Sequence, residues 1–599
     1  MSISAFPDIP LTVGYLDIEV YSGEQGMPDP EKDQVTCFCL WDGQQFISAI
    51  LDDIDIYSRE NDWAIAHFSS ESQLLKFLDK VLYDRQLDII SGWNIPWDLE
   101  YLEKRTQKLG LRLYLDGTNQ FDLLPAYRNL YRRRSYRLKD VVVDEGLSSE
   151  HEQKVNYGKL WKQDKPGLLE RNKRHTQWVR DLDSKLHITD YYLQLRELAG
   201  LEELDTFYPS VLFETMLLRR SPWVLPSKGE YQKQPYEGAL VTKPEAGVFK
   251  DVAVFDLSRF YPSVMIEEML DPKILHEYRL QETDFSWDGY KKFALRYVEE
   301  GKPTILLSLV SEMIEERKKL QLSPEHEGKL AAIKATLNAS YGVSAHTNFR
   351  LFTPEIPERV TEVAREILKE LINRVEILGY KVIYADTDSI FLQLPKDTVV
   401  QAQEEINQIL SELGDYEIKL EHYFSSILFS GAKKRYVGLS EDGELHTTGF
   451  EERRSDSSNF SKEIQREVIM MMLVDEKGRI IPYLMDKIAR IKECKLRDIA
   501  ITKTLSRDLD KYEKQEQNYI KACRDAKWMR IKAGDAVNVV PAKNYPYEVA
   551  CFQDPEDLPR PIDINWDKVV QAQIEAKVRD LLPIVGLNFV ETTGQGKLL

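Results

Sequence analysis

Apolar residues recur along the chain with two spacings, one typical of strands and the other typical of helices. A strand pattern runs over residues 11–20, and a second begins near residues 37–41. Between residues 71 and 83, leucine, phenylalanine and valine recur at helical spacing, which predicts an amphipathic helix. This alternation of short strands and helices predicts an α/β domain over about the first 205 residues.

A stretch short in apolar periodicity, residues 221–235, contains three prolines and predicts a domain boundary. An apolar strand at 251–255 opens the next part of the chain. The later elements are two helical segments at 304–321 and 328–341, a long helix at 357–378, a β-hairpin at 380–394 and a charged, helix-rich stretch from about 461. This order predicts a multidomain protein of mixed α/β class, and 599 residues are enough for about four domains.

Composition narrows the class of protein. Hydrophobic residues make up 43% and charged residues 30% of the chain, which argues against disorder and against a membrane-embedded protein. The five scattered cysteines show neither zinc-site nor disulfide spacing, so we expect reduced thiols in a cytoplasmic protein. A net charge of −19 argues against a nucleic-acid partner, because such domains usually have a basic surface. Net charge does not locate the cations, however.

Two carboxylate motifs follow apolar strands. Asp256 ends the strand that starts at residue 251, although an aspartate in this position is more often a helix cap or a turn residue. Asp386 and Asp388 stand two residues apart at the tip of the predicted hairpin, where their side chains point the same way. Two like charges held together are unfavourable without a cation, so the hairpin predicts a metal site more strongly than a plain polar turn.

A helix face gives the third motif. Lys334, Asn338 and Tyr341 are spaced i, i+4 and i+7, so they share one face of the predicted helix. A cation, an amide and an aromatic ring suit a phosphate tail with a base above it. A solvated amphipathic face is an equally good interpretation of this motif alone.

Together and in this order, the three motifs resemble motifs A, B and C of the family B (alpha-like) DNA-directed DNA polymerases. Motif A corresponds to Asp256–Val264, motif B to Lys334–Gly342 and motif C to Tyr384–Ser389. Further similarities are Tyr236–Ala239 to the YxGG/A segment, Lys433–Tyr436 to the KKxY element, and Thr448–Asp456 to the KGxExxRRD stretch. The resemblance runs from about residue 11 to about residue 590.

The resemblance implies a two-metal mechanism of nucleotidyl transfer, in which Asp256 and Asp388 hold two Mg²⁺ ions, or Mn²⁺, with Asp386 in support. The implied substrate-binding residues are Lys334, Arg317, Asn338, Tyr341, Tyr261, Ser258 and Phe260. Among these, Lys334 and Arg317 would contact the triphosphate, and Tyr261 would act as a steric gate against a 2′-hydroxyl. Many relatives have a lysine four residues after the arginine, where this chain has Gln321. The implied DNA-binding residues are Tyr236, Gly238, Lys433, Lys434, Tyr436, Arg453 and Arg454.

A second carboxylate set lies near the N-terminus. Asp17 and Glu19 emerge from one face of a strand, and Asp98 begins a helix after another strand. In this order they resemble the first two motifs of a DEDD-type 3′–5′ exonuclease, which uses metal ions held by Asp17, Glu19, Asp98 and a fourth aspartate. Asp190 has the better spacing for the fourth, although Leu186 stands where relatives have tyrosine. Asp140, in Tyr136–Asp140, fits the motif by letter but follows Asp98 too soon.

The implied architecture is an RNase H-like exonuclease domain followed by a right-hand polymerase. We expect the exonuclease at 1–220, the palm at 221–300 and 346–460, the fingers at 301–345 and the thumb at 461–599. Few residues precede Asp17, so we do not expect the separate N-terminal domain of many relatives. The expected partners are primer–template DNA, dNTPs and a sliding clamp or other processivity factor, for a monomer in the cytoplasm or nucleoid without membrane contact.

Two other functions remain open from the sequence: a catalytically reduced scaffold subunit, and a protein with exonuclease activity alone. The net charge of −19 is compatible with a DNA enzyme if basic residues line a channel on an acidic body. In that case DNA binding should weaken steeply with salt.

Overall fold

The computed structural model describes residues 11–589 except 22–27, 134, 150, 151, 153, 154, 156, 234, 283, 321–326, 451–456, 513–516 and 530. The chain forms two compact units. The first comprises Met1–Leu225 and Ser308–Ser340, and the second comprises Pro226–Leu307 and Tyr341–Leu599. The chain therefore passes between the units near residue 225 and within two later helices.

A seven-stranded mixed sheet forms the centre of the first unit, with the strand order β4-β5-β3-β2-β1-β6-β7. Its strands are β1 Val13–Val20, β2 Val35–Trp41, β3 Phe46–Leu51, β4 Ile56–Glu60, β5 Trp63–Phe68, β6 Ile89–Gly92 and β7 Asn119–Asp122. Strand β1 lies between β2, antiparallel, and β6, parallel, so both of its edges are paired. Half of the residues of β1 are buried, and Asp17 and Glu19 keep partial access to solvent. The predicted strands at 11–20 and 37–41 are confirmed.

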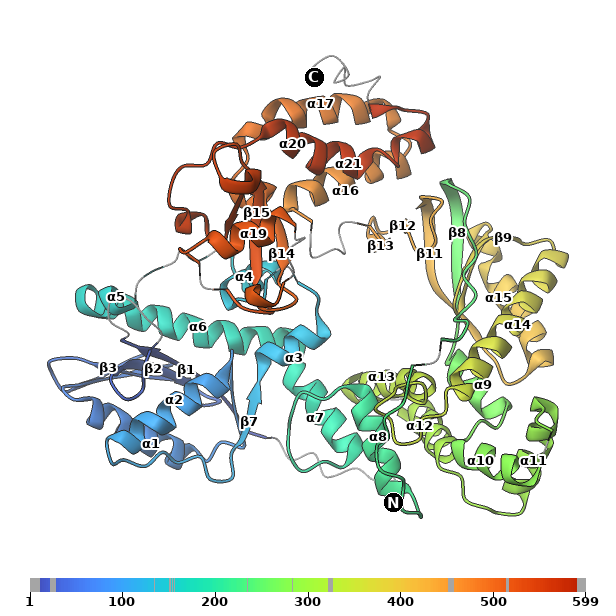
Figure 1. The fold of residues 1–599 in the computed structure, drawn as a ribbon, viewed down its shortest axis with the longest axis horizontal. Helices are drawn as coiled ribbons and strands as arrows, with labels where there is room; N and C mark the ends of the chain where they lie inside the picture. The colour runs from blue at the N-terminus through green and yellow to red at the C-terminus, as the bar shows by residue number, and fades with distance from the viewer. Residues whose placement is uncertain are drawn as a thin grey trace. The chain divides into compact units, whose positions relative to one another are not determined.

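Helices cover both faces of this sheet. The helices of the first unit are α1 Glu71–Arg85, α2 Ile95–Lys108, α3 Leu123–Leu130, α4 Leu138–Asp144, α5 Tyr157–Gln163, α6 Lys165–Leu186, α7 Ile188–Ala199, α8 Pro209–Arg220, α12 Leu306–Leu320 and α13 Glu327–Val343. Helix α6 runs along one face, and α1 and α2 lie on the other (Figure 1). Helix α1 begins at Ser70, whose side chain accepts a hydrogen bond from the Gln73 backbone N–H, so the helix predicted at 71–83 is confirmed with its cap.

An antiparallel six-stranded sheet forms the centre of the second unit, in the order β13-β12-β11-β8-β10-β9. Its strands are β8 Gly247–Leu257, β9 Lys381–Asp386, β10 Ser389–Gln393, β11 Ile418–Phe429, β12 Tyr436–Ser440 and β13 Leu445–Thr448. The helices beside it are α9 Phe260–Glu267, α10 Pro272–Gln281, α11 Trp287–Glu299, α14 Glu355–Ile377 and α15 Val399–Leu413. Figure 1 shows α14 and α15 side by side next to this sheet. The predicted hairpin at 380–394 and helix at 357–378 are confirmed.

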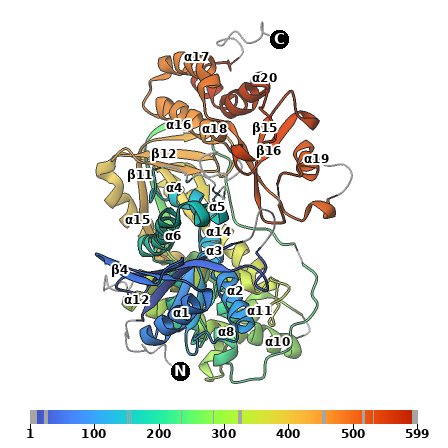
Figure 2. The same cartoon turned by 90° about the vertical axis from the view of Figure 1, so that its left-hand side faces the viewer.

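The C-terminal part of the second unit contains helices and a separate sheet. Its elements are α16 Asn459–Leu473, α17 Ile480–Arg490, α18 Leu496–Ile499, β14 Ile501–Thr504, α19 Asn518–Asp525, β15 Ala536–Pro541, β16 Val549–Phe552, α20 Trp566–Val570 and α21 Ala576–Val578. The sequence predicted helices here but not the antiparallel sheet β14-β15-β16, which Figure 2 shows beside α19. These strands are only four to six residues long, and β14 is only partly buried, so their apolar alternation is weak. None of the described helices is both long and apolar enough to cross a membrane.

Candidate active sites

The first candidate site lies where β8 and β9 end and β10 begins. Asp256, on β8, pairs in register with Ser389 of β10, and the Ser389 hydroxyl donates a hydrogen bond of 3.0 Å to its carboxylate. The Leu257 N–H donates to the carbonyl of Asp388 at 2.8 Å. Burial, and then the charge of Asp256, raise the pKa of Asp388 to about 7. Two carboxylates are therefore held together at one sheet edge, as the hairpin motif predicted.

Asp386 is held by three neighbouring side chains. Lys434 Nζ lies 2.5 Å from Asp386 Oδ1, the Thr387 hydroxyl donates to the same oxygen, and the Tyr384 hydroxyl donates to Oδ2 at 3.1 Å. Thr387 has φ 65°, in the left-handed region, so the chain turns sharply between the two aspartates. The carboxylate of Asp386 is therefore already bound by protein side chains, next to the two carboxylates of Asp256 and Asp388.

An aromatic cluster stands beside the aspartates. The Tyr261 ring, on α9, meets the Tyr341 ring edge-on with centroids 4.4 Å apart. Burial, and then the neighbouring Tyr341 and Asp388, raise the pKa of Tyr261, while burial and Asp388 raise that of Tyr341. Both rings therefore lie within electrostatic reach of Asp388. Phe260 is buried and packs against Tyr416, so a nucleotide could meet Phe260 only through its backbone.

The segment 236–242 runs beside the hairpin and is fixed by residues that the sequence analysis did not select. The Thr387 N–H donates to the Leu240 carbonyl at 2.9 Å, and Val241 forms an isolated bridge to Asp386. From α14, the Arg365 guanidinium donates to the carbonyls of Glu237 and Gly238 at 2.8 and 2.7 Å. No sequence signal distinguishes Arg365 from the other arginines of an amphipathic helix.

The predicted motif B residues lie on α13. Lys334 and Asn338 are exposed, while Ile333, Thr336 and Leu337 are buried on other faces of the helix. Lys329 at the start of α13 forms an ion pair of 3.1 Å with Glu316 of α12, where Arg317 is half-buried. Lys334, Asn338 and Arg317 belong to the first unit and the aspartates to the second, so their shared action on one nucleotide stays a prediction.

The predicted DNA-contacting residues differ in exposure. Lys433, Lys434 and Gly238 are exposed, and Tyr236 is half-buried. Tyr436 packs its ring against Tyr384, Phe391 and Phe429 in the sheet core. Arg453, Arg454 and Gln321 lie outside the described residues.

The second candidate site lies on β1 in the first unit. Asp17, Glu19 and His175 of α6 offer ligand atoms that all lie within 4.8 Å of one another. Burial, and then the charge of Asp17, raise the pKa of both Glu19 and Asp98. Asp98 accepts a hydrogen bond of 3.3 Å from the Ile18 N–H, which places it between the two acids along β1. The structure thus brings together three of the four predicted carboxylates.

Among the described residues, the fourth predicted carboxylate is not part of the group whose ligand atoms lie within 4.8 Å of one another. Asp190 lies in the first turn of α7 with 70% of its side chain exposed and contacts His187 at 3.3 Å. The alternative, Asp140, is buried in an ion pair with Arg137. The middle of α6, rather than its end, passes the acid pair, and there Asn172 donates a hydrogen bond of 2.7 Å to Asp17. Residue spacing alone could not show which turn of this helix faces β1.

His175 and the side chains around it were not among the residues predicted from the sequence. Burial lowers the pKa of His175, but contacts with Asp17, Glu152 and Glu19 more than offset this and raise it to about 10. Burial, and then the charge of Glu19, raise the pKa of Tyr157, which accepts a hydrogen bond from Arg171 at 3.4 Å. His175 matches no exonuclease motif, so only its position on the inner face of α6 could have indicated it.

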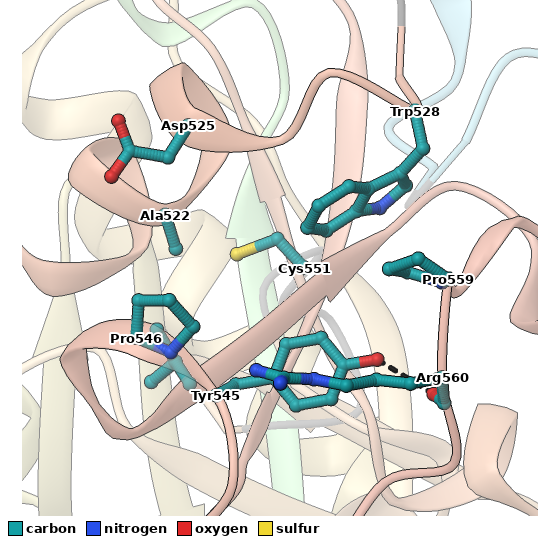
Figure 3. A pocket seen from close by; sticks show the side chains of 9 residues that line it. Ala522, Asp525, Trp528, Tyr545, Pro546, Cys551, Pro559 and Arg560 are labelled. Atoms are coloured by element: carbon teal, nitrogen blue, oxygen red, sulfur yellow. Dashed lines mark hydrogen bonds between the residues drawn. The ribbon is translucent and has the colours of Figure 1, made fainter.

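A separate pocket of about 310 Å³ lies in the C-terminal part of the second unit. Its lining residues are distant in sequence from the predicted site residues. Figure 3 shows Trp528, Cys551 and Tyr545 lining it, with the Arg560 guanidinium 4.7 Å from the Tyr545 ring centre. The Tyr545 hydroxyl donates to the Arg560 carbonyl at 2.7 Å. The lining is mainly apolar.

Comparison with known families decides between the open interpretations. Residues 208–574 match DNA polymerase family B, and residues 4–113 match its exonuclease domain. The chain belongs to DNA polymerase family B.

Relatives of this family B polymerase include archaeal enzymes. It is 27% identical over 584 residues to DNA polymerase 2 of Aeropyrum pernix, with 89% of this chain and 69% of that protein covered. It is also 27% identical to a DNA polymerase of Archaeoglobus fulgidus, with 88% and 68% covered. The structure of the family B DNA polymerase from Pyrobaculum calidifontis matches 98% of this chain and 80% of that one, with a TM-score of 0.68 and 24% identity. The predicted family, fold class and enzyme class are thus confirmed, and the protein is a DNA-directed DNA polymerase with an exonuclease domain.

Family B polymerases use divalent metal ions, and the donor sets of this polymerase fit such ions. Asp256 and Asp388 supply carboxylate oxygens, the ligands that hard cations prefer. The raised pKa values of Asp388, Glu19 and Asp98 reflect burial and like charges that a cation would offset. Primer–template DNA and dNTPs are the substrates that the family implies.

Proposed function

We propose that this polymerase extends a primer by two-metal nucleotidyl transfer at Asp256 and Asp388, with two Mg²⁺ ions bound there, or Mn²⁺. The observation that supports this most is the pairing of Asp256 with the hairpin, which leaves Asp388 with a pKa near 7. When bound, the ions would activate the primer 3′-hydroxyl and stabilise the leaving pyrophosphate. Asp386, paired with Lys434, would hold the hairpin tip rather than contact the nucleotide.

The substrate contacts form the second part of the proposal. Tyr261, braced by Tyr341, would exclude a 2′-hydroxyl, while Asn338 and Tyr341 pack on the nascent base pair. Lys334 and Arg317 would neutralise the triphosphate as charge develops, with Ser258 and the Phe260 backbone beside it. The DNA backbone would be bound by Tyr236, Gly238, Lys433, Lys434, Tyr436, Arg453 and Arg454.

We also propose that the exonuclease domain removes mismatched 3′ ends, using metal ions at Asp17, Glu19 and Asp98. Asp17 and Glu19 lie on β1 with Asp98 of α2 beside them, and the raised pKa values of Glu19 and Asp98 support a site built for a cation. The domain limits would be 1–220, 221–300, 301–345, 346–460 and 461–599, for exonuclease, palm, fingers, palm and thumb. The protein would act as a monomer with a sliding clamp or another processivity factor, in the cytoplasm or nucleoid where its DNA substrate lies.

Primer extension with Mg²⁺ and dNTPs tests the polymerase, and wild-type protein should lengthen a matched primer while Asp256→Asn should not. A wild-type protein that shortens primers but never extends them would contradict the polymerase proposal. A mismatched primer tests the exonuclease: Asp17→Ala should abolish its shortening while matched primers are still extended. Equal shortening by wild type and Asp17→Ala would exclude this site as its source.

A further inference from the structure

The exonuclease site contains a nitrogen donor aimed at its acid pair. His175 Nδ1 lies 3.7 Å from Asp17 Oδ2 and 3.8 Å from Glu19 Oε1. These separations are too long for direct hydrogen bonds. Donor atoms that each bind one ion at about 2.1 Å can be no more than about 4.2 Å apart. Both His175 separations meet this limit, and all three ligand atoms lie within 4.8 Å of one another, so a small movement would let one cation contact Nδ1 and both carboxylate oxygens.

The imidazole ring is held in this orientation from its other side. His175 Nε2 lies 2.9 Å from Glu152 Oε2, and the ring stacks on Trp178 with centroids 5.6 Å apart. Arg171 and Arg174 contact Glu152 at 2.5 and 2.8 Å and fix it in turn. A metal-bound histidine almost always donates its second ring N–H to a carboxylate, which sets the tautomer and the ring angle. His175 and Glu152 already have this arrangement.

We propose that Asp17, Glu19 and His175 form a mixed nitrogen–oxygen metal site that prefers Mn²⁺ to Mg²⁺. Magnesium favours oxygen ligands in near-ideal octahedral geometry, whereas Mn²⁺ also suits carboxylate oxygens but, as a first-row transition ion, binds an imidazole nitrogen more readily than Mg²⁺ does. Among the described residues, the ligand atoms that lie within 4.8 Å of one another here belong to Asp17, Glu19 and His175, so His175 supplies the third protein ligand of this ion. The catalytic use of the site rests on the proposed exonuclease function, but metal binding can be measured without it.

Binding of Mn²⁺ is measured by electron paramagnetic resonance on the full chain carrying Asp256→Asn and Asp388→Asn, so that the polymerase site does not contribute. We expect one bound Mn²⁺ ion whose spin-echo spectrum shows coupling to a directly bound imidazole nitrogen. Displacement by Mg²⁺ should need at least about 10 times the Mn²⁺ concentration. Absence of bound Mn²⁺, or bound Mn²⁺ without the nitrogen coupling, would overturn the proposal. The first of these results would instead favour a protonated His175 as the permanent counter-charge of the acid pair.

Three variants in the same background isolate the ligand. His175→Ala should remove the nitrogen coupling and weaken Mn²⁺ binding, while His175→Asp should keep a metal but lose the preference for Mn²⁺. Glu152→Gln, which leaves the ligands in place, should weaken Mn²⁺ binding by about 10- to 100-fold. An unchanged Mn²⁺ preference in His175→Asp would refute the assignment, and thermal unfolding checks that each variant is folded.

His187→Ala is the matched control, because this histidine of the same unit is 73% exposed and contacts Asp190 instead. It should bind Mn²⁺ like its parent, and a loss as large as that of His175→Ala would refute the role of His175. Shortening of mismatched primers by the wild type tests the proposed exonuclease separately. That activity can stand while the nitrogen coupling is absent, so the two failures are distinguishable.

Discussion

In the absence of metal, ionisation of Asp388 should lower the free energy of unfolding of the second unit as the pH rises. Its pKa is about 7 in the folded protein against an ordinary value of 3.8, a difference of about three pKa units. The stabilisation from its bound proton is fully present below pH 3.8 and is lost as the pH rises through 7. At about 1.4 kcal/mol per pKa unit, the loss amounts to at most about 4 kcal/mol, and partial solvent access reduces it.

Asp388→Asn has no ionisable carboxyl group, so its free energy of unfolding should rise relative to that of the wild type between pH 4 and pH 8. The free energy of unfolding of the second unit is measured by urea denaturation with a metal chelator present, at several pH values. Asp397→Asn, at an exposed position in the same unit, should follow the wild-type pH dependence. Parallel curves for Asp388→Asn and the wild type would refute the raised pKa. Addition of Mg²⁺ should stabilise the wild type at pH 8 more than Asp388→Asn, because only the wild type retains the charged ligand.

Three further predictions concern substrate and DNA. Tyr261→Ala should raise the ratio of ribonucleotide to deoxyribonucleotide incorporation, while Tyr261→Phe, which keeps the ring against Tyr341, should not. Equal ratios in the wild type and both variants would exclude a steric gate. Lys434→Gln should lower kcat for extension because Asp386 loses its ion-pair partner, whereas Lys433→Gln should mainly weaken DNA binding. Equal effects of the two variants on kcat would contradict these separate roles of the two lysines. The log of the DNA binding constant should fall with log salt by about 0.9 per phosphate contacted, and a flat dependence would contradict a basic channel.

Motif C was predictable from sequence because its geometry is local. Two apolar runs around Asp386 and Asp388 specify a hairpin, and the structure has β9 and β10 there. The partnership of Asp256 with Ser389 depends on strands separated by 133 residues in the sequence, so it followed only from the resemblance. The contacts of Lys434 and Arg365 depend on how distant segments pack, and no local pattern indicates them.

The exonuclease site was predictable from sequence only in part. Its first two motifs were found because Asp17 and Glu19 lie on one strand and Asp98 lies in the first turn of the helix after another. The third was sought among aspartates, whereas α6 presents Asn172 and His175 to the acid pair. A 22-residue helix offers several turns to the same strand, and only tertiary packing selects one of them. The short strands β14–β16 were missed for a related reason, since β14 pairs with a distant part of the chain, Ile501 with Val539 and Thr504 with Ala536.

The hydrogen bonds from α14 to the segment 236–242 indicate where the chain can accept insertions. Residues 227–233 before it are exposed, whereas Arg365 and Thr361 bond the carbonyls that follow. Insertions are tolerated where the backbone is exposed and little bonded. Over evolution, and in engineered fusions, extra sequence should therefore be accepted at 227–233 without disturbing the aspartate hairpin. The same insertion a few residues later would shift the register of the strand-like bridge at Val241.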